Sequence, residues 1–308
     1  MLNEFFIICN EPYKKTPDKV IELKPNSKVI WIYDKQQMPY VLRGFILVVG
    51  KNQYKYLAEN IVLTTLKGIF SQKIFQAKFQ DEYEIIALIG KGNYARVYSA
   101  RQRMTQKKFA VKCFEKNKLQ ETDRGMLSLY NELKVMRNIC DNPNIIKLYE
   151  TFEGENTFYF VMEIIENCTS LYEDVKKHSQ IPYQDIEIMQ IMKMILEGLN
   201  YISSKKIMHR DLKLENILYL KKDQQQYLKI VDFGLGNFCD EYPYLFPKCG
   251  TPGFVAPEIA NLVDKTSKYS TVCDIFSAGI YKFKYNLLSN PVFQMPLFDI
   301  SMNVNIKK

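Results

Sequence analysis

The sequence lacks a long hydrophobic run and contains only two histidines among its 308 residues. Its longest apolar stretches, such as residues 45–49, are much shorter than the roughly 18 residues that a membrane-spanning helix needs. The apolar residues 5–9 follow Glu4 and not a basic segment, and no small-residue cleavage site comes after them. We therefore expect neither a transmembrane helix nor a signal peptide.

The cysteines also exclude two classes of protein. Seven of them are scattered along the chain without a C-x-x-C pair, which is not the pattern of a disulfide framework or a zinc site. They are typical of reduced thiols, so we expect a cytoplasmic protein. The 47% hydrophobic content excludes a disordered chain, and the length predicts a large domain with a smaller one.

Positive charge is concentrated near the amino terminus. The first 80 residues contain 12 Lys and Arg against 6 Asp and Glu, within a net charge of +8 for the whole chain. Such a basic part indicates either an anionic partner, such as a lipid or membrane surface that the protein binds peripherally, or only solvated surface charge. We expect no nucleic-acid partner.

Short runs rich in β-branched and aromatic residues predict strands at 29–33, 40–49, 54–57 and 61–64, with a turn at 50–52. The apolar residues of 71–80 predict a short amphipathic helix that links this part to the next domain. We therefore expect a small antiparallel β module at 1–80. Its pattern is similar to a truncated pleckstrin-homology-like module.

The segment 208–216 contains Asp211, Lys213 and Asn216, and the apolar run that precedes Asp232 ends in Asp-Phe-Gly. These two segments resemble the H-R-D-L-x-x-x-N and D-F-G motifs of the eukaryotic protein kinase family. The resemblance implies that Asp211 orients a substrate hydroxyl and accepts its proton, while Lys213 stabilises the transferred phosphoryl group. It also implies that Asn216 and Asp232 bind Mg²⁺.

Residues 83–98 predict a strand, a glycine turn and a second strand, which excludes a Rossmann arrangement because no helix follows the glycines. The next strand carries Phe-Ala-Val-Lys at 109–112 and resembles the V-A-I-K strand of the kinases. By this resemblance Lys112 binds the ATP phosphates and pairs with Glu132 on a helix predicted at 126–139. The resemblance implies further ATP contacts from Ile89, Gly90, Gly92, Val97, Ala110, Met162, Glu163, Ile165 and Leu218.

The position of Lys213 and the segment 249–258 resemble Ser/Thr kinases, and within these the calcium/calmodulin-dependent group. The implied fold class is α+β: a bilobal protein kinase domain at 81–308, with a β-rich N-lobe and an α-rich C-lobe. A helix predicted at 185–203 delivers the catalytic loop. The implied function is transfer of the ATP γ-phosphate to Ser/Thr hydroxyls of protein substrates.

The resemblance becomes weaker after Gly279. Lys282 and Lys284 fall in a helix that is normally deeply buried, and the chain stops at Lys308, before the family's last helices. We therefore expect an incomplete C-lobe. Two other interpretations stay open: a catalytically inactive pseudokinase or scaffold, and a lipid-surface adaptor led by residues 1–80.

The segment 235–248 contains no serine or threonine. Kinases with an arginine before the catalytic aspartate, here Arg210, usually bind a phosphate on this loop with it. We therefore expect activity that needs no Ser/Thr phosphorylation of the loop. We also expect Asp240 or Glu241 to supply the negative charge that faces Arg210.

Overall fold

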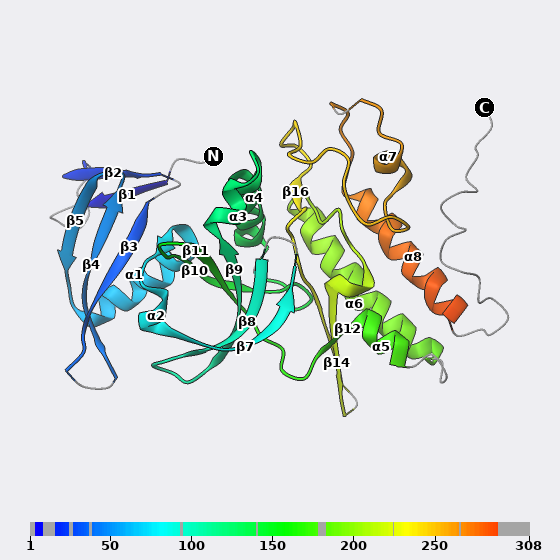
Figure 1. The fold of residues 1–308 in the computed structure, drawn as a ribbon, viewed down its shortest axis with the longest axis horizontal. Coiled ribbons are helices and arrows are strands. Elements are labelled where there is room, and N and C mark those ends of the chain that lie inside the picture. Colours follow the sequence, from blue (N-terminus) through cyan, green and yellow to red (C-terminus); the bar gives the residue numbers. More distant parts are fainter. Residues whose placement is uncertain are drawn as a thin grey trace. The chain divides into compact units, whose positions relative to one another are not determined.

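The computed structural model describes residues 4–8, 16–24, 27–36, 39–92, 95–139, 141–177, 183–223, 225–264 and 266–288. The chain divides into two compact units (Figure 1). The first comprises Met1–Leu119 and Leu148–Ile164, and the second comprises Gln120–Lys147 and Ile165–Lys308. A β-rich unit and a helical unit agree with the predicted α+β bilobal class. The domain boundary predicted near residue 80 stays a prediction, and it lies inside the first unit.

The amino-terminal part of the first unit is an antiparallel meander. Strands β3 (Lys28–Asp34), β4 (Val41–Val49) and β5 (Asn52–Leu57) pair in chain order, as the sequence predicts. Gly50 makes the predicted turn with a φ of 61°, a conformation that glycine adopts without strain. Strands β1 (Glu4–Ile8) and β2 (Lys19–Leu23) form a separate antiparallel pair. The pleckstrin-homology-like resemblance stays a prediction.

The strand predicted at 61–64 is wrong, because these residues belong to helix α1 (Asn60–Lys73). Within the run, Leu63 is fully buried whereas Ile61 is 73% exposed. Leu63, Phe70 and Ile74 recur at helical spacing and pack on the meander, so packing outweighs the β propensity of the four-residue run.

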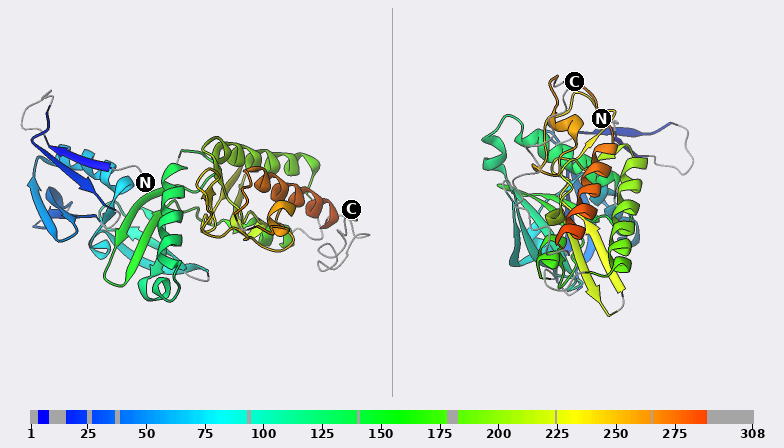
Figure 2. Two further views of the ribbon diagram at one scale, coloured as in Figure 1. Left: turned by 90° about the horizontal axis from the view of Figure 1, so that it is seen from above. Right: turned by 90° about the vertical axis from the view of Figure 1, so that its right-hand side faces the viewer.

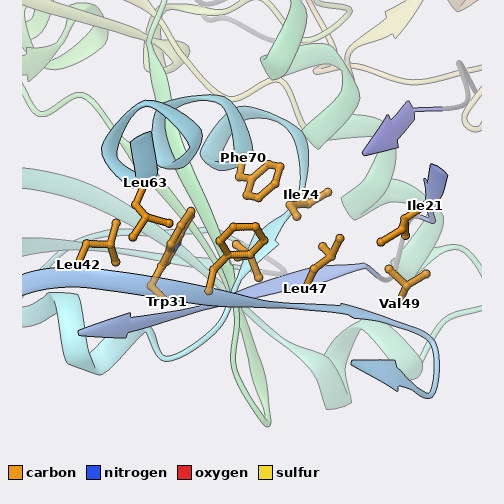
Figure 3. Packing of buried hydrophobic residues seen from close by; sticks show 10 residues of the cluster. Ile21, Trp31, Leu42, Leu47, Val49, Leu63, Phe70 and Ile74 are labelled. Atoms are coloured by element: carbon orange, nitrogen blue, oxygen red, sulfur yellow. The ribbon is translucent and has the colours of Figure 1, made fainter. Parts of the chain in front are cut away.

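Aromatic and aliphatic side chains fill the space between α1 and the meander. Trp31, Phe45 and Phe70 form the centre of this cluster, with Trp31 and Phe45 ring centroids 5.7 Å apart and Phe45 and Phe70 centroids 5.4 Å apart. Figure 3 shows Leu63 and Phe70 of α1 pointing toward Trp31 and Leu47 of the sheet. This part of the chain therefore has its own hydrophobic core.

The linker helix predicted at 71–80 is also wrong. Helix α1 ends at Lys73, the two-residue strand β6 (Phe75–Gln76) follows, and a short helix α2 spans Phe79–Glu82. Strand β6 lies parallel to both β3 and β10 (Leu148–Glu153). The amino-terminal meander and the kinase-like strands consequently form one nine-stranded sheet in the order β5-β4-β3-β6-β10-β11-β9-β8-β7.

The kinase-like strands of this sheet are antiparallel and follow the predicted order. They are β7 (Tyr83–Lys91), β8 (Ala95–Gln102), β9 (Lys108–Glu115) and β11 (Thr157–Met162), with β10 beside β11. A short helix α3 (Lys116–Gln120) follows β9. The predicted strand, glycine turn and strand at 83–98 are thus confirmed, apart from residues 93 and 94, which lie outside the described residues.

The second unit is mainly helical. Its longest described helices are α4 (Gly125–Asn138), α6 (Asp185–Ser204) and α8 (Val272–Leu288). The first two agree to within one residue at each end with the helices predicted at 126–139 and 185–203. Gln184 and Glu187 form a capping box at the start of α6. The shorter elements are β12 (Thr169–Ser170), α5 (Leu171–Lys177), β13 (Ile207–Met208), a 3₁₀ turn (Leu214–Asn216), β14 (Ile217–Lys222), β15 (Gln225–Ile230), β16 (Asn237–Phe238) and α7 (Pro257–Ala260).

Helices α6 and α8 run side by side (Figure 2). The buried face of α6 carries Ile188, Ile191 and Ile195, which recur at helical spacing as the sequence predicts. Lys282 and Lys284 lie within α8, and the expected end of the C-lobe beyond residue 288 lies outside the described residues. None of the helices that the structure describes is both long and apolar enough to cross a membrane.

Candidate active site

The buried carboxylate of Asp274 accepts hydrogen bonds from the backbone of the segment that precedes Asp211. The backbone amides of His209 and Arg210 donate to Asp274 Oδ2 and Oδ1 at 2.7 and 2.8 Å. Burial raises the pKa of Asp274, and the two amides and the charge of Arg210 oppose that effect. Arg210 has a φ of 66°, a conformation that costs free energy in a non-glycine residue and is fixed here by these bonds. The loop is therefore turned so that the next residue, Asp211, leaves the core.

Asp211 lies at the centre of a compact polar cluster. Its Oδ2 is 3.1 Å from Lys213 Nζ, and its Oδ1 accepts a hydrogen bond of 2.6 Å from Thr251 Oγ1. Lys213 Nζ also donates to Thr251 Oγ1 at 3.0 Å. Asn216 Nδ2 donates to the Asp211 carbonyl at 2.9 Å and to its carboxylate at 3.3 Å. The predicted Asp211, Lys213 and Asn216 are thus brought together, and Thr251 is an additional member to which the sequence alone gave no role.

The backbone directly before Asp232 is hydrogen-bonded to Asn216. The Val231 amide donates to the Asn216 carbonyl at 2.9 Å, and His209 Nε2 lies 3.0 Å from the Val231 carbonyl. Asp232 itself has a φ of 63° and an exposed side chain. The segment that holds Asn216 therefore also fixes the backbone from which the Asp232 carboxylate projects.

The glycine after Phe233 leaves room for two carboxylates. A Cβ at Gly234 would lie 3.3 Å from Asp232 Oδ1 and 3.5 Å from Glu132 Oε2. Helix α4, which carries Glu132, is tied to this segment because Asn131 Nδ2 donates to the Gly236 carbonyl at 2.6 Å. The contact of Asn131 is a feature that the sequence motifs do not reveal.

The donor set suits a hard cation that keeps part of its hydration. Asn216 and Asp232 offer one amide oxygen and one carboxylate, and both are oxygen ligands. No group of three or more His, Cys, Asp or Glu that could hold a metal occurs in the described part of the chain. Mg²⁺ does not need such a group, because it is usually bound by one or two carboxylates together with water and phosphate oxygens.

The predicted nucleotide-binding residues of the first unit lie on four neighbouring strands, β7, β8, β9 and β11, or directly next to them. Lys112 on β9 is in register with Val97 on β8 and with Phe160 on β11. Ala110 is likewise opposite Met162, and both side chains are buried. The glycine turn between β7 and β8 is closed by a hydrogen bond of 2.9 Å from the Gly92 amide to the Ala95 carbonyl. Backbone amides near such a turn can approach phosphate oxygens.

The predicted site residues divide between the two units. The first unit contains Ile89, Gly90, Gly92, Val97, Ala110, Lys112, Met162 and Glu163, and the second contains Glu132, Ile165, Asp211, Lys213, Asn216, Leu218 and Asp232. Each set is ordered within its own unit. The pairing of Lys112 with Glu132 joins the two sets and stays a prediction, as do the roles of the individual residues.

Arg210 does not face the acidic residues that the sequence suggested. Its Nε donates to the Leu235 carbonyl at 2.7 Å, and one terminal nitrogen donates to the Phe246 carbonyl at 2.8 Å and to Tyr269 Oη at 2.9 Å. Asp240 pairs instead with Lys206 and Glu241 with Lys134. The expectation that Asp240 or Glu241 supplies a charge to Arg210 is therefore wrong. The neutral oxygens reach Arg210 because the segment after Gly234 folds back over it.

The chain is similar to known protein kinases. The family model of the protein kinase domain matches residues 83–308. Calcium-dependent protein kinase 5 of Plasmodium falciparum is 36% identical over 207 residues, which are 67% of this chain and 34% of that protein. Calcium-dependent protein kinase 3 of Plasmodium yoelii yoelii is 35% identical over 208 residues, 67% of this chain and 36% of that protein.

A third relative comes from another organism. A probable serine/threonine-protein kinase, fhkC of Dictyostelium discoideum, is 33% identical over 204 residues, 66% of this chain and 33% of that protein. The matched stretch thus spans about a third of the length of these curated relatives. The match to the family model, by contrast, covers residues 83–308, which are most of the present chain. The chain belongs to the protein kinase family.

Proposed function

We propose that this chain is an ATP-dependent protein serine/threonine kinase. The observation that carries the proposal is the cluster in which Asp211, Lys213, Thr251 and Asn216 are joined by direct contacts of 2.6 to 3.3 Å. Phosphoryl transfer depends mainly on positioning and on neutralisation of charge, which such a preorganised cluster supplies. Relatives named as serine/threonine or calcium-dependent kinases support the same reaction class.

Each polar residue of the cluster has a separate task. Asp211 orients the substrate hydroxyl and accepts its proton, and Lys213 places a positive charge next to the transferred phosphoryl group. Asn216 and Asp232 hold Mg²⁺, which neutralises phosphate charge when it is bound. Thr251 keeps the Asp211 carboxylate and the Lys213 ammonium in position, since its hydroxyl bonds both.

The proposal also assigns the residues that bind the nucleotide, by resemblance to the family. Lys112 binds the phosphates and is held by Glu132, while the glycine turn at 90–92 covers the phosphates with backbone amides. Met162, Glu163 and Ile165 border the adenine. Ile89, Val97, Ala110 and Leu218 supply the apolar surfaces on either side of the base.

The proposal is tested by measuring binding and transfer in parallel. We expect Mg-ATP to raise the melting temperature of the full chain, since a ligand that binds only the folded state stabilises it. We also expect transfer of labelled phosphate to a basic peptide with serine or threonine, but not to the matched peptide with tyrosine in their place. Binding without transfer would favour the alternative, a pseudokinase or scaffold. Absence of both would contradict the proposal.

A second, binding function follows from the surface of β5. Lys55 on β5 and Lys51 in the turn before it are exposed, and Leu57, two residues after Lys55, is 67% exposed. Many other cations of this part are neutralised, for example Lys35 by Asp81 and Arg43 by Asp34. We propose that the surface of β5 contacts an anionic membrane peripherally, from the cytoplasm.

This binding function is measured by cosedimentation with vesicles that contain phosphatidylserine. The K51E/K55E variant should lose binding, while Asp211→Asn should keep it. Equal recovery of the wild-type and K51E/K55E proteins with the vesicles would contradict the assignment of this surface.

A further inference from the structure

The residues before the kinase match are built into the sheet of the kinase small lobe. Strand β6 pairs with β3 through Val29 and Gln76 and with β10 through Gln76 and Phe152. Gln76 is fully buried between them. A short strand in this position has hydrogen-bonding neighbours on both sides, so it joins the amino-terminal meander to the lobe without an exposed edge.

Two aromatic residues of the same segment pack into the lobe itself. Phe75 lies 5.2 Å from Phe158, measured between ring centroids. Phe79 stacks on Tyr159 at 4.1 Å and on Tyr83 at 5.3 Å, within the cluster that forms the core of the kinase strands. The side chains that fill this core therefore come from both sides of residue 80.

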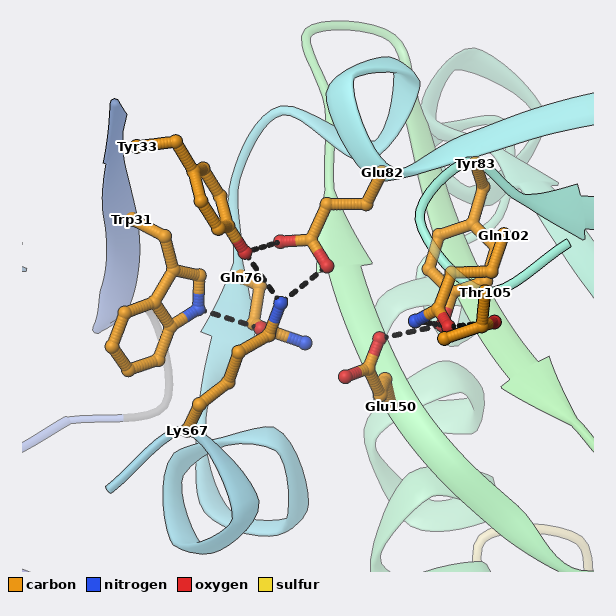
Figure 4. Close-up of polar contacts among 9 residues, drawn as sticks. All are labelled: Trp31, Tyr33, Lys67, Gln76, Glu82, Tyr83, Gln102, Thr105 and Glu150. Carbon is orange, nitrogen blue, oxygen red and sulfur yellow. Dashed lines mark hydrogen bonds and ion pairs between the residues drawn. The ribbon is translucent and has the colours of Figure 1, made fainter. Parts of the chain in front are cut away.

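A network of partly buried polar side chains connects α1 and β3 with the start of β7 (Figure 4). Lys67 pairs with Glu82 and donates to Tyr33 Oη at 2.7 Å. Tyr33 Oη in turn donates to Glu82 at 3.1 Å. Beside them, Trp31 Nε1 donates to Gln76 Oε1 at 2.7 Å. Tyr33 and Trp31 belong to β3 and Lys67 to α1, whereas Glu82 is the last residue before β7.

The network continues into the first residue of β7. Tyr83 Oη donates to Glu150 at 2.8 Å and accepts from Gln102 Nε2 at 3.3 Å. The Glu82 carbonyl accepts from the Arg103 amide at 2.8 Å, which ties this point to the end of β8. Strands β7 and β8 flank the glycine turn, so both are anchored at the ends opposite to that turn.

The charges of the network depend on one another. Burial alone would lower the pKa of Lys67, but the Glu82 and Glu150 carboxylates outweigh this and raise that pKa above its ordinary value. Lys67 is consequently charged at neutral pH, and it forms an ion pair with Glu82. Removal of one partner from a buried ion pair is costly, because it leaves the other charge uncompensated.

We propose that Lys67, Tyr33 and Glu82 are positioning residues through which the first 80 residues fix strand β7 and hence the glycine turn at 90–92. The amino-terminal part thus acts in cis as a permanent support for the nucleotide-binding strands. Its link to the proposed kinase function is that the turn which it supports binds ATP. A displaced turn presents its backbone amides less favourably to the phosphates, so ATP binds more weakly.

The test compares Lys67→Met with Lys35→Met in the full chain. Lys35, directly after β3, pairs at 3.0 Å with Asp81, the neighbour of Glu82 in α2, but this pair is exposed, so its loss should have little effect. Lys67→Met should speed amide hydrogen exchange at 83–91 and 95–102 and raise KM for ATP by about tenfold, with kcat nearly unchanged. It should also lower the melting temperature by about 5 °C or more.

Two further variants keep the test decisive. Tyr33→Phe removes one hydroxyl and should change hydrogen exchange, KM and melting temperature in the same direction but by less. It replaces Lys67→Met in the test if that variant does not fold. Glu82→Gln added to Lys67→Met removes the uncompensated charge and should restore part of the melting temperature but not the slow exchange. If exchange at 83–102 in folded Lys67→Met or Tyr33→Phe equals that of Lys35→Met, the inference is wrong. Exchange does not depend on catalysis, so a wild-type chain without transfer would overturn the proposed function alone.

Discussion

Arg210 is a buried cation whose side chain donates hydrogen bonds to neutral oxygens. Two carbonyls and the Tyr269 hydroxyl accept its hydrogen bonds, and the Tyr244 ring lies 5.6 Å from its guanidinium carbon. Burial raises the pKa of Tyr269 to about 12, so its hydroxyl stays protonated and also donates to the Pro247 carbonyl at 2.8 Å. Hydrogen bonds from Arg210 to the Leu235 and Phe246 carbonyls therefore hold the loop at 235–248 to this side chain.

This arrangement predicts that transfer does not require phosphorylation of the loop. Protein treated with phosphatase should transfer phosphate at the rate of untreated protein. Tyr269→Phe should lower the free energy of unfolding by about 1 to 3 kcal/mol, because a buried charged donor loses an acceptor. Urea unfolding measures the second effect, with Tyr172→Phe at an exposed site as the control. Strict dependence on an upstream kinase that acts within 235–248 would contradict this account.

Glu150 gives a prediction about pH. Burial, and then the neighbouring Glu82, raise its pKa above the ordinary value of 4.5, while Lys67 and the bond from Tyr83 oppose that shift. The folded state thus holds a proton that the unfolded state releases, so this group loses its contribution to stability as pH rises above about 4.5.

Replacement of Glu150 by glutamine should flatten this part of the pH profile. Glu150→Gln keeps an acceptor for Tyr83 and removes the ionisation, so the melting temperature should gain most at the alkaline end of the range. Glu153→Gln provides the control. Glu153 lies on the same strand as Glu150, and its carboxylate pairs with Lys116. A gain that is the same at every pH would rule out Glu150 as the titrating group.

Helix α1 shows, at the scale of an element, why part of the fold could not be predicted. Residues 61–64 are β-branched or leucine, which is the composition of a strand. The hydroxyls of Thr64 and Thr65 donate to the Asn60 and Ile61 carbonyls at 2.7 and 3.1 Å, so both hydroxyls have hydrogen-bond acceptors within the helix. The spacing of the buried side chains distinguishes the helix from a strand, and this spacing becomes clear only over the full length of α1.

The helical assignment of 61–64 is testable by two adjacent substitutions. Leu63→Ala should destabilise by about 2 to 5 kcal/mol, because it empties a fully buried site. Val62 is exposed, and alanine has a higher helix propensity than valine. Val62→Ala should therefore leave the free energy of unfolding unchanged or raise it by a few tenths of a kcal/mol. Chemical denaturation gives both values. Comparable losses at 62 and 63 would instead fit a strand buried on both faces.

At the scale of the whole molecule, local motifs were the predictable part. Asp211, Lys213 and Asn216 lie within six residues, so the loop that carries them brings them together whatever the rest of the chain does. Strand β6 has only two residues, and it exists because Val29 and Phe152 lie on either side of it. Thr251 joins the Asp211 cluster from 40 positions away, which no local pattern can show.

The central claim is that Asp211 is the base of a phosphoryl-transfer site. The most direct measurement is the initial rate of phosphate transfer from ATP to a serine peptide by the wild-type chain and by Asp211→Asn. We expect a loss of the order of 10²-fold or more, with the melting temperature and ATP binding unchanged. Asp240→Asn, at an exposed ion pair with Lys206, should keep the wild-type rate. A near-normal rate for Asp211→Asn would contradict the assignment of the site.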